Sequence, residues 1–531
     1  MKKARVLHPL FFALFPVLFA FAHNAAHVSF GELILPLLVV LACTAAFWAA
    51  LWVVYRDWLN AAVVLSLFLV LFFSFGHVRD AALQAGVWLR VKYLLPVWTV
   101  LLIVGACAVK RRRGPLCNLT RILNVVGGCL VAMSLFNIAA YHVRSRRPIG
   151  YVRGREGVGP ADGQALTPQQ PPDIYYIILD RYARADVLRE RYGCDNTEFL
   201  DHLREKGFYV ASQSCSNYPK TAHSLASSLN MEHLLDLTAE LGEDCGDWGP
   251  LYERLRDYKA WRFLTRRGYT FVHLGSWWSP TARNKFAHRN INLYLLPEFA
   301  GVIYSTTMLQ PILAATSLYD ERRMQWERVQ YKLAELARLP RSRGPIFAFA
   351  HMLLPHPPYV FGRDGTYVTR AQEREQTRAA SYTNQLSYTN RCLQRLVDTL
   401  IDTARVPPVI ILQADEGPFP ERYRRNEDSF DWTAATPEEL REKMAIFSAY
   451  YLPGLPPEKL NPSITPVNSF RLVFSHYFQA DLQLLPDHCY VFQDHKHLYK
   501  FTNVTATLRA HPPTIHGAAP HPPPQPPGEA P

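Results

Sequence analysis

The stretch DIYYIILD at residues 173–180 decides how the fold of this 531-residue chain is read. Its six consecutive apolar or aromatic residues end at an acid, a pattern typical of a strand buried on both faces of a parallel sheet. Four further runs are similar, and they predict strands over 269–275, 345–351, 408–415 and 444–452.

Helical patterns separate these strands. The amphipathic segments lie at residues 195–206, 221–235, 251–267, 320–338 and 377–401. Strands that alternate with helices favour a mostly parallel sheet with helices on both of its faces. We therefore predict one α/β domain over residues 172–510, which is long enough to bury a substantial core.

The first quarter of the chain has a different composition. Five stretches without Asp, Glu, Lys or Arg predict transmembrane helices near 6–24, 33–55, 58–78, 93–109 and 122–143. Each is close to or above the roughly 20 residues that cross a bilayer. The alternative, buried helices of a soluble protein, is disfavoured because five such runs leave no polar face for water.

The distribution of Lys and Arg predicts the orientation of this bundle. With the N-terminus inside, nine Lys or Arg residues lie in the inner segments and three in the outer segments. The positive-inside rule then places everything after about residue 144 outside the cytoplasm. Cleavage of a signal peptide after Ala22 would give the same result with four spans. We expect a multi-pass protein of the plasma (inner) membrane with an extracytoplasmic C-terminal domain.

The charge balance argues against nucleic-acid binding. Residues 1–143 carry a net charge of +9, whereas the rest of the chain carries only +3, so no broad basic surface is implied for the larger part. Residues 144–171 are rich in Gly, Pro and Arg and predict a linker, and residues 511–531 predict a Pro-rich disordered tail. The five cysteines after residue 143 fit no zinc motif, and their pairing stays open.

Polar residues with metal-binding chemistry end three of the predicted strands. Asp180 ends the first, His351 ends the strand over 345–351, and Asp415 and Glu416 follow the strand over 408–415. Because ligands bind at the carboxyl ends of parallel strands, we expect these side chains to share one cleft. The alternative is that each only marks the point where a strand reaches solvent.

Two further segments carry candidate catalytic groups. Thr221 stands at the predicted start of a helix, where backbone N–H groups favour an anion, although an ordinary N-cap threonine is a common alternative. His356 lies between Pro355 and Pro357, which restrict its backbone. His351 and His356 are candidates for binding a substrate anion or a metal, and a purely structural role is the alternative for both.

These residues resemble the alkaline phosphatase/sulfatase superfamily. The segment 196–227 is similar to the helix and Gly-Phe turn before the nucleophile motif, and Asp180 resembles the first metal acid. QADEGP at 413–418 resembles the late Asp-His-Gly metal motif, and 444–478 resembles the final strand and helix. The resemblance covers most of 172–480. With the membrane helices before it, the chain resembles the lipoteichoic acid synthase and phosphoethanolamine transferase type.

Two departures from the family pattern bear on the chemistry. The run from Thr221 to Leu225 replaces the sulfatase C/S-x-P-S-R motif, and threonine cannot form formylglycine, so phosphoryl transfer is favoured over sulfuryl transfer. Glu416 stands where the family usually has His. The resemblance implies one divalent ion held by Asp180, Thr221, Asp415 and Glu416. This all-oxygen set suits Mn²⁺ or Mg²⁺ better than Zn²⁺, which is still possible.

The resemblance implies a membrane-bound, metal-dependent transferase that moves a phospholipid-derived phosphoryl head group to an envelope glycan or lipid. Thr221 would be the nucleophile, with His351, His356 and Ser224 as substrate-binding residues, and His356 would also take part in catalysis. The expected partners are a phospholipid donor and an envelope acceptor, without nucleic acid. One alternative is a membrane-tethered phosphodiesterase or sulfatase, and another is a non-catalytic envelope protein on the same fold.

Overall fold

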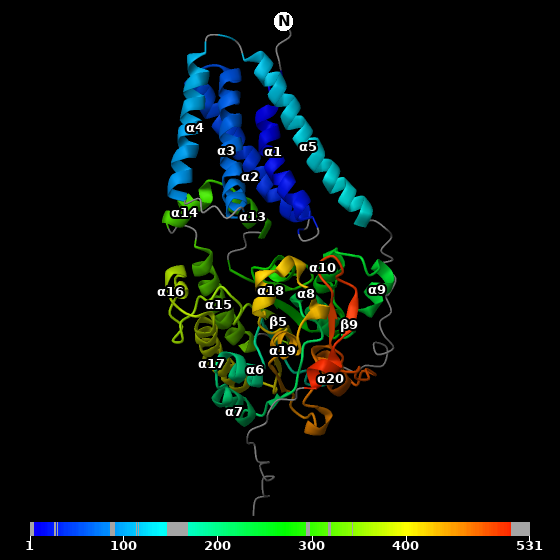
Figure 1. The fold of residues 1–531 in the computed structure, drawn as a ribbon. Helices are drawn as coiled ribbons and strands as arrows, with labels where there is room; N and C mark the ends of the chain where they lie inside the picture. Colours follow the sequence, from blue (N-terminus) through cyan, green and yellow to red (C-terminus); the bar gives the residue numbers. More distant parts are fainter. Residues whose placement is uncertain are drawn as a thin grey trace, which may run out of the picture.

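The structure is a computed structural model that describes residues 5–25, 28, 30–84, 91–112, 114, 116–145, 168–293, 298–316, 320–341 and 344–510. Most of the predicted linker 144–171 and the whole predicted tail 511–531 lie outside the described residues. The described part of the chain forms a helical bundle at one end and an α/β domain at the other (Figure 1). The predicted fold class is confirmed.

Five helices form the bundle, close to the predicted positions. They are α1 (His8–His23), α2 (Phe30–Tyr55), α3 (Trp58–Gln84), α4 (Val91–Arg111) and α5 (Cys117–Ser145). Among the described residues, α2 to α5 are long and apolar enough to cross a membrane, whereas α1 is apolar but has only 16 residues. The bundle exposes apolar side chains such as Leu38, Val100 and Phe136, as expected of helices that face lipid.

The α/β domain that follows the bundle, over residues 172–510, is called the outer domain below. It is built on a seven-stranded sheet of order β2-β7-β6-β1-β5-β3-β4. Its strands are β1 (Ile174–Leu179), β2 (Tyr209–Val210), β3 (Thr270–Leu274), β4 (Arg289–Ile291), β5 (Ile346–Met352), β6 (Val409–Gln413) and β7 (Ser448–Tyr451). The neighbours β6, β1, β5, β3 and β4 are parallel, whereas β7 pairs antiparallel with β6 and with β2. A hairpin of β8 (Tyr490–Phe492) and β9 (Phe501–Asn503) stands apart.

The antiparallel direction of β7 corrects the expectation of a parallel strand over 444–452. After β6 the chain stays at the carboxyl edge of the sheet, where the Ala414 N–H donates to the Phe447 carbonyl at 2.8 Å. Because β7 starts from the edge at which β6 ended, it has to run back along β6. The sequence of the strand shows its burial but not its direction.

The predicted helices are present with small changes. They are α7 (Thr197–Glu205), α8 (Thr221–Asn230), α10 (Gly249–Arg256), α11 (Lys259–Thr265), α15 (Glu321–Arg338) and α17 (Arg378–Asp402). The segment 221–235 ends as a helix at Asn230 because Met231 takes a left-handed conformation with φ 58°. The remaining helices are α6 (Ala185–Tyr192), α9 (Leu235–Leu241), α12 (Ser279–Ala282), α13 (Glu298–Thr306), α14 (Leu309–Thr316), α16 (Arg370–Arg374), α18 (Glu421–Arg425), α19 (Pro437–Met444), α20 (Ser469–Tyr477) and α21 (Thr505–Arg509).

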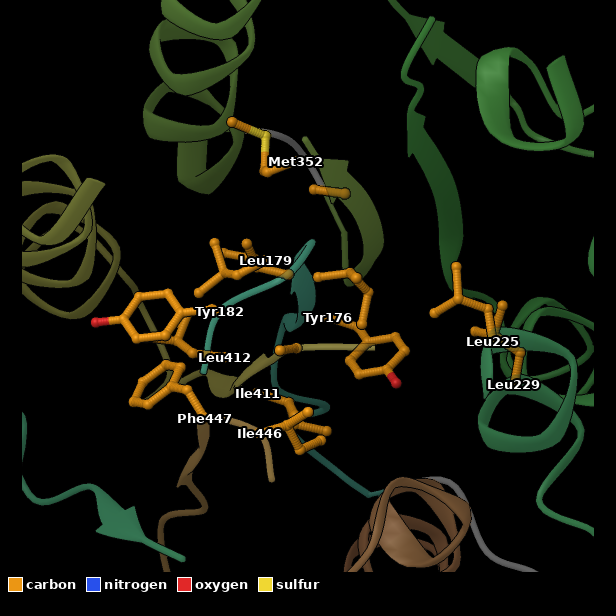
Figure 2. Packing of buried hydrophobic residues seen from close by; sticks show 14 of the residues in the cluster. Tyr176, Leu179, Tyr182, Leu225, Leu229, Met352, Ile411, Leu412, Ile446 and Phe447 are labelled. Atoms are coloured by element: carbon orange, nitrogen blue, oxygen red, sulfur yellow. The ribbon is translucent and has the colours of Figure 1, made fainter. Parts of the chain in front are cut away.

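The central strand β1 is buried along its whole length and organises the core on both faces of the sheet. Figure 2 shows Leu225 and Leu229 of α8 on the side to which Tyr176 points, and Tyr182 and Phe447 together on the other side. The rings of Tyr182 and Phe447 lie 4.5 Å apart. This packing holds the start of α8 beside the carboxyl ends of the central strands.

All nine cysteines are free thiols.

Candidate metal centre and active site

Three side chains meet where the central parallel strands end. Asp180 follows β1, His351 is the penultimate residue of β5, and Asp415 lies two residues after β6. Because β6, β1 and β5 are neighbours, their carboxyl ends lie together, and one potential ligand atom from each residue lies within 4.8 Å of the others. Of the four side chains predicted to share one cleft, Asp180, His351 and Asp415 lie together in this cluster, and Glu416 is not among the converging residues.

The polar atoms of this cluster are buried without partners. Asp180 Oδ1, His351 Nε2 and both carboxylate oxygens of Asp415 make no hydrogen bond with any described residue. His351 Nδ1 lies 2.8 Å from the Thr281 hydroxyl, which leaves Nε2 facing Asp180 Oδ2 at 3.6 Å. Buried polar atoms nearly always have a hydrogen-bond partner. A set of buried oxygen and nitrogen atoms without one therefore fits the ligands of a bound cation.

The electrostatics of the cluster agree with that fit. Burial raises the pKa of both aspartates, and the repulsion among Asp180, Asp415 and Glu416 raises it further. Burial lowers the pKa of His351 to about 4, so its imidazole is neutral near pH 7. A neutral imidazole is a metal ligand, and a divalent cation would relieve the repulsion between the carboxylates.

Thr221 is the first residue of α8, directly after the extended Lys220 that caps the helix. Burial and the neighbouring carboxylates raise the pKa of Asp415, and the Thr221 hydroxyl, which faces that carboxylate, offsets a small part of the rise. Ser224, one turn further along α8, is buried, and its hydroxyl makes no hydrogen bond with a described residue. The structure thus brings the predicted nucleophile next to the metal cluster.

Glu416 has a different set of neighbours from the other acids. Its Oε1 lies 2.7 Å from Lys443 Nζ and 3.5 Å from Arg181 Nε. Its Oε2 is buried without a hydrogen bond to a described residue, and Glu416 is not one of the residues that converge on the potential ligand position. The role of Glu416 as a metal ligand stays a prediction. Its contacts also allow it to hold the side chains of Lys443 and Arg181 in position.

A cationic wall of Arg181, Lys220 and Lys443 borders the nucleophile. The three charged groups lie 3.7, 4.6 and 3.7 Å from the centre of the Phe419 ring, where cation–π attraction holds them together. Arg181 adopts φ 65°, a left-handed conformation that is costly for a residue other than glycine. Strain of this kind is common at functional sites, and two of the three residues, Arg181 and Lys220, directly adjoin Asp180 and Thr221 in the chain.

His356 lies beside this wall. Gln385 Nε2 donates to the backbone carbonyls of Pro355 and His356, which fixes the loop, and His356 Nδ1 contacts the Pro357 carbonyl. Burial, followed by repulsion from Arg181, holds the pKa of His356 well below its usual value. Because Nδ1 faces a carbonyl oxygen, it carries the proton, and Nε2 is free to accept one.

Three residues that position this site were not identified from the sequence. Thr281 fixes the ring of His351, Lys332 donates from Nζ to the His351 carbonyl at 2.5 Å, and Lys443 pairs with Glu416. Thr281 lies in the short helix α12 and Lys332 lies within the long helix α15, so neither has a local signal. Arg181 and Lys220 adjoin Asp180 and Thr221 in the chain, and that adjacency is the only signal they carry.

The site also contacts the membrane bundle. The Ser279 hydroxyl donates to Glu32 Oε1 at 2.6 Å, and Glu32 lies in the first turn of α2. Two residues further on, Thr281 holds His351, and the neighbouring Trp278 ring lies 6.1 Å from the His351 ring. The metal cluster is therefore only a few side chains away from the end of a membrane helix.

A family model described as Sulfatase matches residues 172–469, which is 298 of the 531 residues. The chain belongs to the sulfatase family. Its outer domain is an enzyme domain of this superfamily, and the predicted resemblance is confirmed at that level. A search of curated protein sequences finds no match.

A search of solved structures returns bacterial phosphoethanolamine transferases and a putative sulfatase as similar to this chain. The C-terminal periplasmic domain of EcEptC from Escherichia coli, solved as a zinc complex, is 12% identical, covers 63% of this chain and 93% of its own, and has a TM-score of 0.42. The lipooligosaccharide phosphoethanolamine transferase A of Neisseria meningitidis is 13% identical, with coverages of 85% and 89% and a TM-score of 0.34. A putative sulfatase from Bacteroides fragilis is 13% identical, with coverages of 59% and 75% and a TM-score of 0.38.

Proposed function

We propose that this protein is a membrane-bound, metal-dependent, sulfatase-like transferase. It would move a phosphoryl head group from a membrane phospholipid to a hydroxyl of an envelope glycan or lipid. In this proposal the chain divides into a transmembrane domain over 1–143, a linker over 144–171, a catalytic domain over 172–510 and a tail. The bundle would be multi-pass in the plasma (inner) membrane, with the catalytic domain on the extracytoplasmic side.

One observation carries the proposal: a buried set of unpartnered ligand atoms lies beside a threonine at the start of a helix. Asp180, His351 and Asp415 would hold one divalent ion, with Thr221 as a further oxygen ligand. An imidazole in the set removes the preference for Mn²⁺ or Mg²⁺ over Zn²⁺ that an all-oxygen set implied. The ion, when bound, would lower the pKa of the Thr221 hydroxyl and neutralise developing charge.

The chain's own residues account for the remaining steps. The Thr221 oxygen forms a bond to phosphorus and the bond from phosphorus to the diacylglycerol oxygen breaks, which leaves a phosphothreonine diester that still carries the head group. His356 Nε2 takes the threonine proton and delivers it to the leaving oxygen. An acceptor hydroxyl then attacks the phosphothreonine, and its proton returns to Thr221 by the same route.

The cationic wall would hold the transferred group. Arg181, Lys220 and Lys443 gather around the Phe419 ring, and the Glu416 carboxylate pairs with Arg181 and Lys443. Positioned cations stabilise the charge that builds up on phosphoryl oxygens. The Ser279–Glu32 contact supports a membrane-bound donor, because it keeps the site near lipid head groups.

Replacing the nucleophile tests the proposal. Thr221→Ala should lower transfer at least about 10³-fold, since removal of a nucleophile usually leaves only residual catalysis. The measurement follows label from a phospholipid with a labelled head group into an acceptor lipid or glycan. Thermal unfolding of the variant should match the wild type, because Thr221 is only partly buried.

Two controls sharpen that experiment. Thr221→Ser keeps a hydroxyl at the same place and should retain measurable transfer. Label that appears only in a water-soluble product would instead identify a hydrolase, with water as the acceptor. Transfer by Thr221→Ala at the wild-type rate would contradict the assignment of the nucleophile.

A further inference from the structure

The outer domain sends a helical hairpin back against the membrane bundle. It consists of α13 and α14, which lie at the ends of the bundle helices that face the outer domain (Figure 1). Its sequence over 299–319, FAGVIYSTTMLQPILAATSLY, contains no Asp, Glu, Lys or Arg. A charge-free segment of 21 residues is unusual for a part of a water-exposed domain.

α13 packs into the core of the bundle and not into that of the outer domain. Phe299 and Ile303 are buried in the same hydrophobic cluster as residues of α1, α2 and α3, and the Phe299 ring lies 5.8 Å from Phe21. A Cβ atom on Gly76 of α3 would come within 2.6 Å of the Thr306 Cα. Only a glycine permits so close an approach of α3 to the end of α13.

The contact between the hairpin and α3 gives the position of the hairpin along α3. The Met308 N–H donates to the Phe72 carbonyl at 3.0 Å. The apolar part of α3 ends at Arg79, seven residues after Phe72, and seven residues of helix span about 10 Å. The turn between α13 and α14 therefore lies beside the last apolar turns of α3, and the Arg79 guanidinium reaches back to it and donates to Gln310 Oε1 at 3.1 Å. This is the arrangement expected of an arginine at the edge of the hydrocarbon layer.

The turn has the internal hydrogen bonding that this position requires. The N–H groups of Thr307 and Gln310 donate to the carbonyls of Tyr304 and Thr307, and the Leu309 N–H donates to the Thr307 hydroxyl. With the Met308–Phe72 bond, all four amides from 307 to 310 are satisfied without water. The hydroxyls of Ser305, Thr306 and Thr307 also donate to backbone carbonyls three residues earlier. Irregular backbone at membrane depth is stable only when it is satisfied in this way.

The outer surface of the hairpin is apolar. Leu309 and Ile312 are 40% and 42% exposed. Among the described residues after 145, only three other large hydrophobic side chains are exposed to a similar extent: Leu235, Tyr331 and Leu484. The exposed apolar side chains of α14 thus resemble those of the bundle helix α4, which exposes Val97 and Val100.

We infer that α13–α14 is a re-entrant hairpin in the membrane leaflet nearest the outer domain, where Leu309 and Ile312 contact the acyl chains of phospholipids. The inference rests on the proposed membrane placement and not on the transferase reaction. Together with the Ser279–Glu32 contact, the hairpin would fix the height of the active site above the lipid head groups.

Site-specific photo-crosslinking tests this inference on the full chain in phosphatidylethanolamine and phosphatidylglycerol vesicles. Benzoylphenylalanine is introduced at Leu309, at Ile312 and, as the matched control, at Leu484, which is a leucine of equal exposure after α20. Val100 on α4 provides the positive control. Illumination should attach phospholipid to positions 309, 312 and 100, with a yield several-fold above that at position 484.

The result that overturns the inference is a lipid yield at both 309 and 312 no higher than at 484, while position 100 still reacts. Two positions on successive turns guard against a single variant that fails to fold. The same measurement on the Thr221→Ala background should give the same yields, because crosslinking needs no turnover. A failure of the proposed transferase function would therefore leave this test intact.

Discussion

Two buried aspartates six residues apart have opposite surroundings. Asp186 accepts hydrogen bonds from Arg184 at 2.7 and 2.8 Å and from Arg441 at 2.7 Å. Asp180 faces Asp415 and a neutral His351, and its Oδ1 has no partner among the described residues. Burial alone raises the pKa of both, but the arginines outweigh it at Asp186 and lower its pKa to about 2, whereas Glu416 raises that of Asp180 further.

The difference distinguishes a carboxylate that is paired within the folded chain, Asp186, from a carboxylate that is available to bind a ligand, Asp180. Removing one partner of a buried carboxylate–arginine pair destabilises the folded chain, because it leaves an uncompensated charge. A buried carboxylate beside other carboxylates destabilises the folded chain until a cation arrives. Within this segment, Asp180 is available to bind a cation, and Asp186, through its bonds to Arg184 and Arg441, anchors the loop that contains Asp180.

The largest expected effect on stability comes from neutralising each aspartate in turn. Asp186→Asn should lower the free energy of unfolding by about 3–5 kcal/mol, because it leaves Arg184 buried without its charge partner. Asp180→Asn in metal-free protein should leave the stability unchanged or raise it, since it removes a repulsion. Thermal unfolding of the full chain in detergent, with a chelator present, measures both effects.

Asp201→Asn is the control for the substitution itself, since Asp201 pairs with Arg204 on the exposed surface. It should change the stability by less than about 1 kcal/mol. Equal losses for Asp180→Asn and Asp186→Asn would contradict the comparison. They would mean that Asp180 is stabilised by a partner in the metal-free chain.

A smaller effect concerns pH. The pKa of Asp186 falls from an ordinary 3.8 to about 2 on folding, so its contribution is fully present above about pH 4 and is lost as the pH falls towards 2. The shift is equivalent to about 2 kcal/mol. The stability difference between wild type and Asp186→Asn should shrink by that amount over this range. A difference independent of pH would contradict the ion-pair explanation.

Much of the site was predictable because it follows from the ends of strands. Asp180, His351 and Asp415 end or follow apolar strands, and parallel strands bring their carboxyl ends together without further information. The roles were less predictable. His351 was a candidate for binding a substrate anion or a metal and lies with Asp180 and Asp415 in the candidate metal cluster, whereas Glu416, expected as a ligand, faces Lys443.

The remaining features depend on contacts between distant segments. Lys443 meets Glu416 only because the chain turns back at the carboxyl edge before β7, and neither residue shows this locally. Thr281 is recognised only through its hydrogen bond to His351. The hairpin α13–α14 did carry a signal, a charge-free run over 299–319, but its two short helices resemble ordinary core segments until their contacts with α3 are seen.

The central claim is that Asp180, His351 and Asp415 hold one divalent ion beside Thr221. Metal analysis of the purified full chain, stripped with a chelator, reloaded with Mn²⁺ or Zn²⁺ and dialysed, tests it most directly. The account predicts about one ion per chain in the wild type and in Asp186→Asn, and a loss of the ion in Asp180→Asn and Asp415→Asn. A wild-type chain that retains neither ion, or an Asp415→Asn variant that binds as well as the wild type, would contradict it.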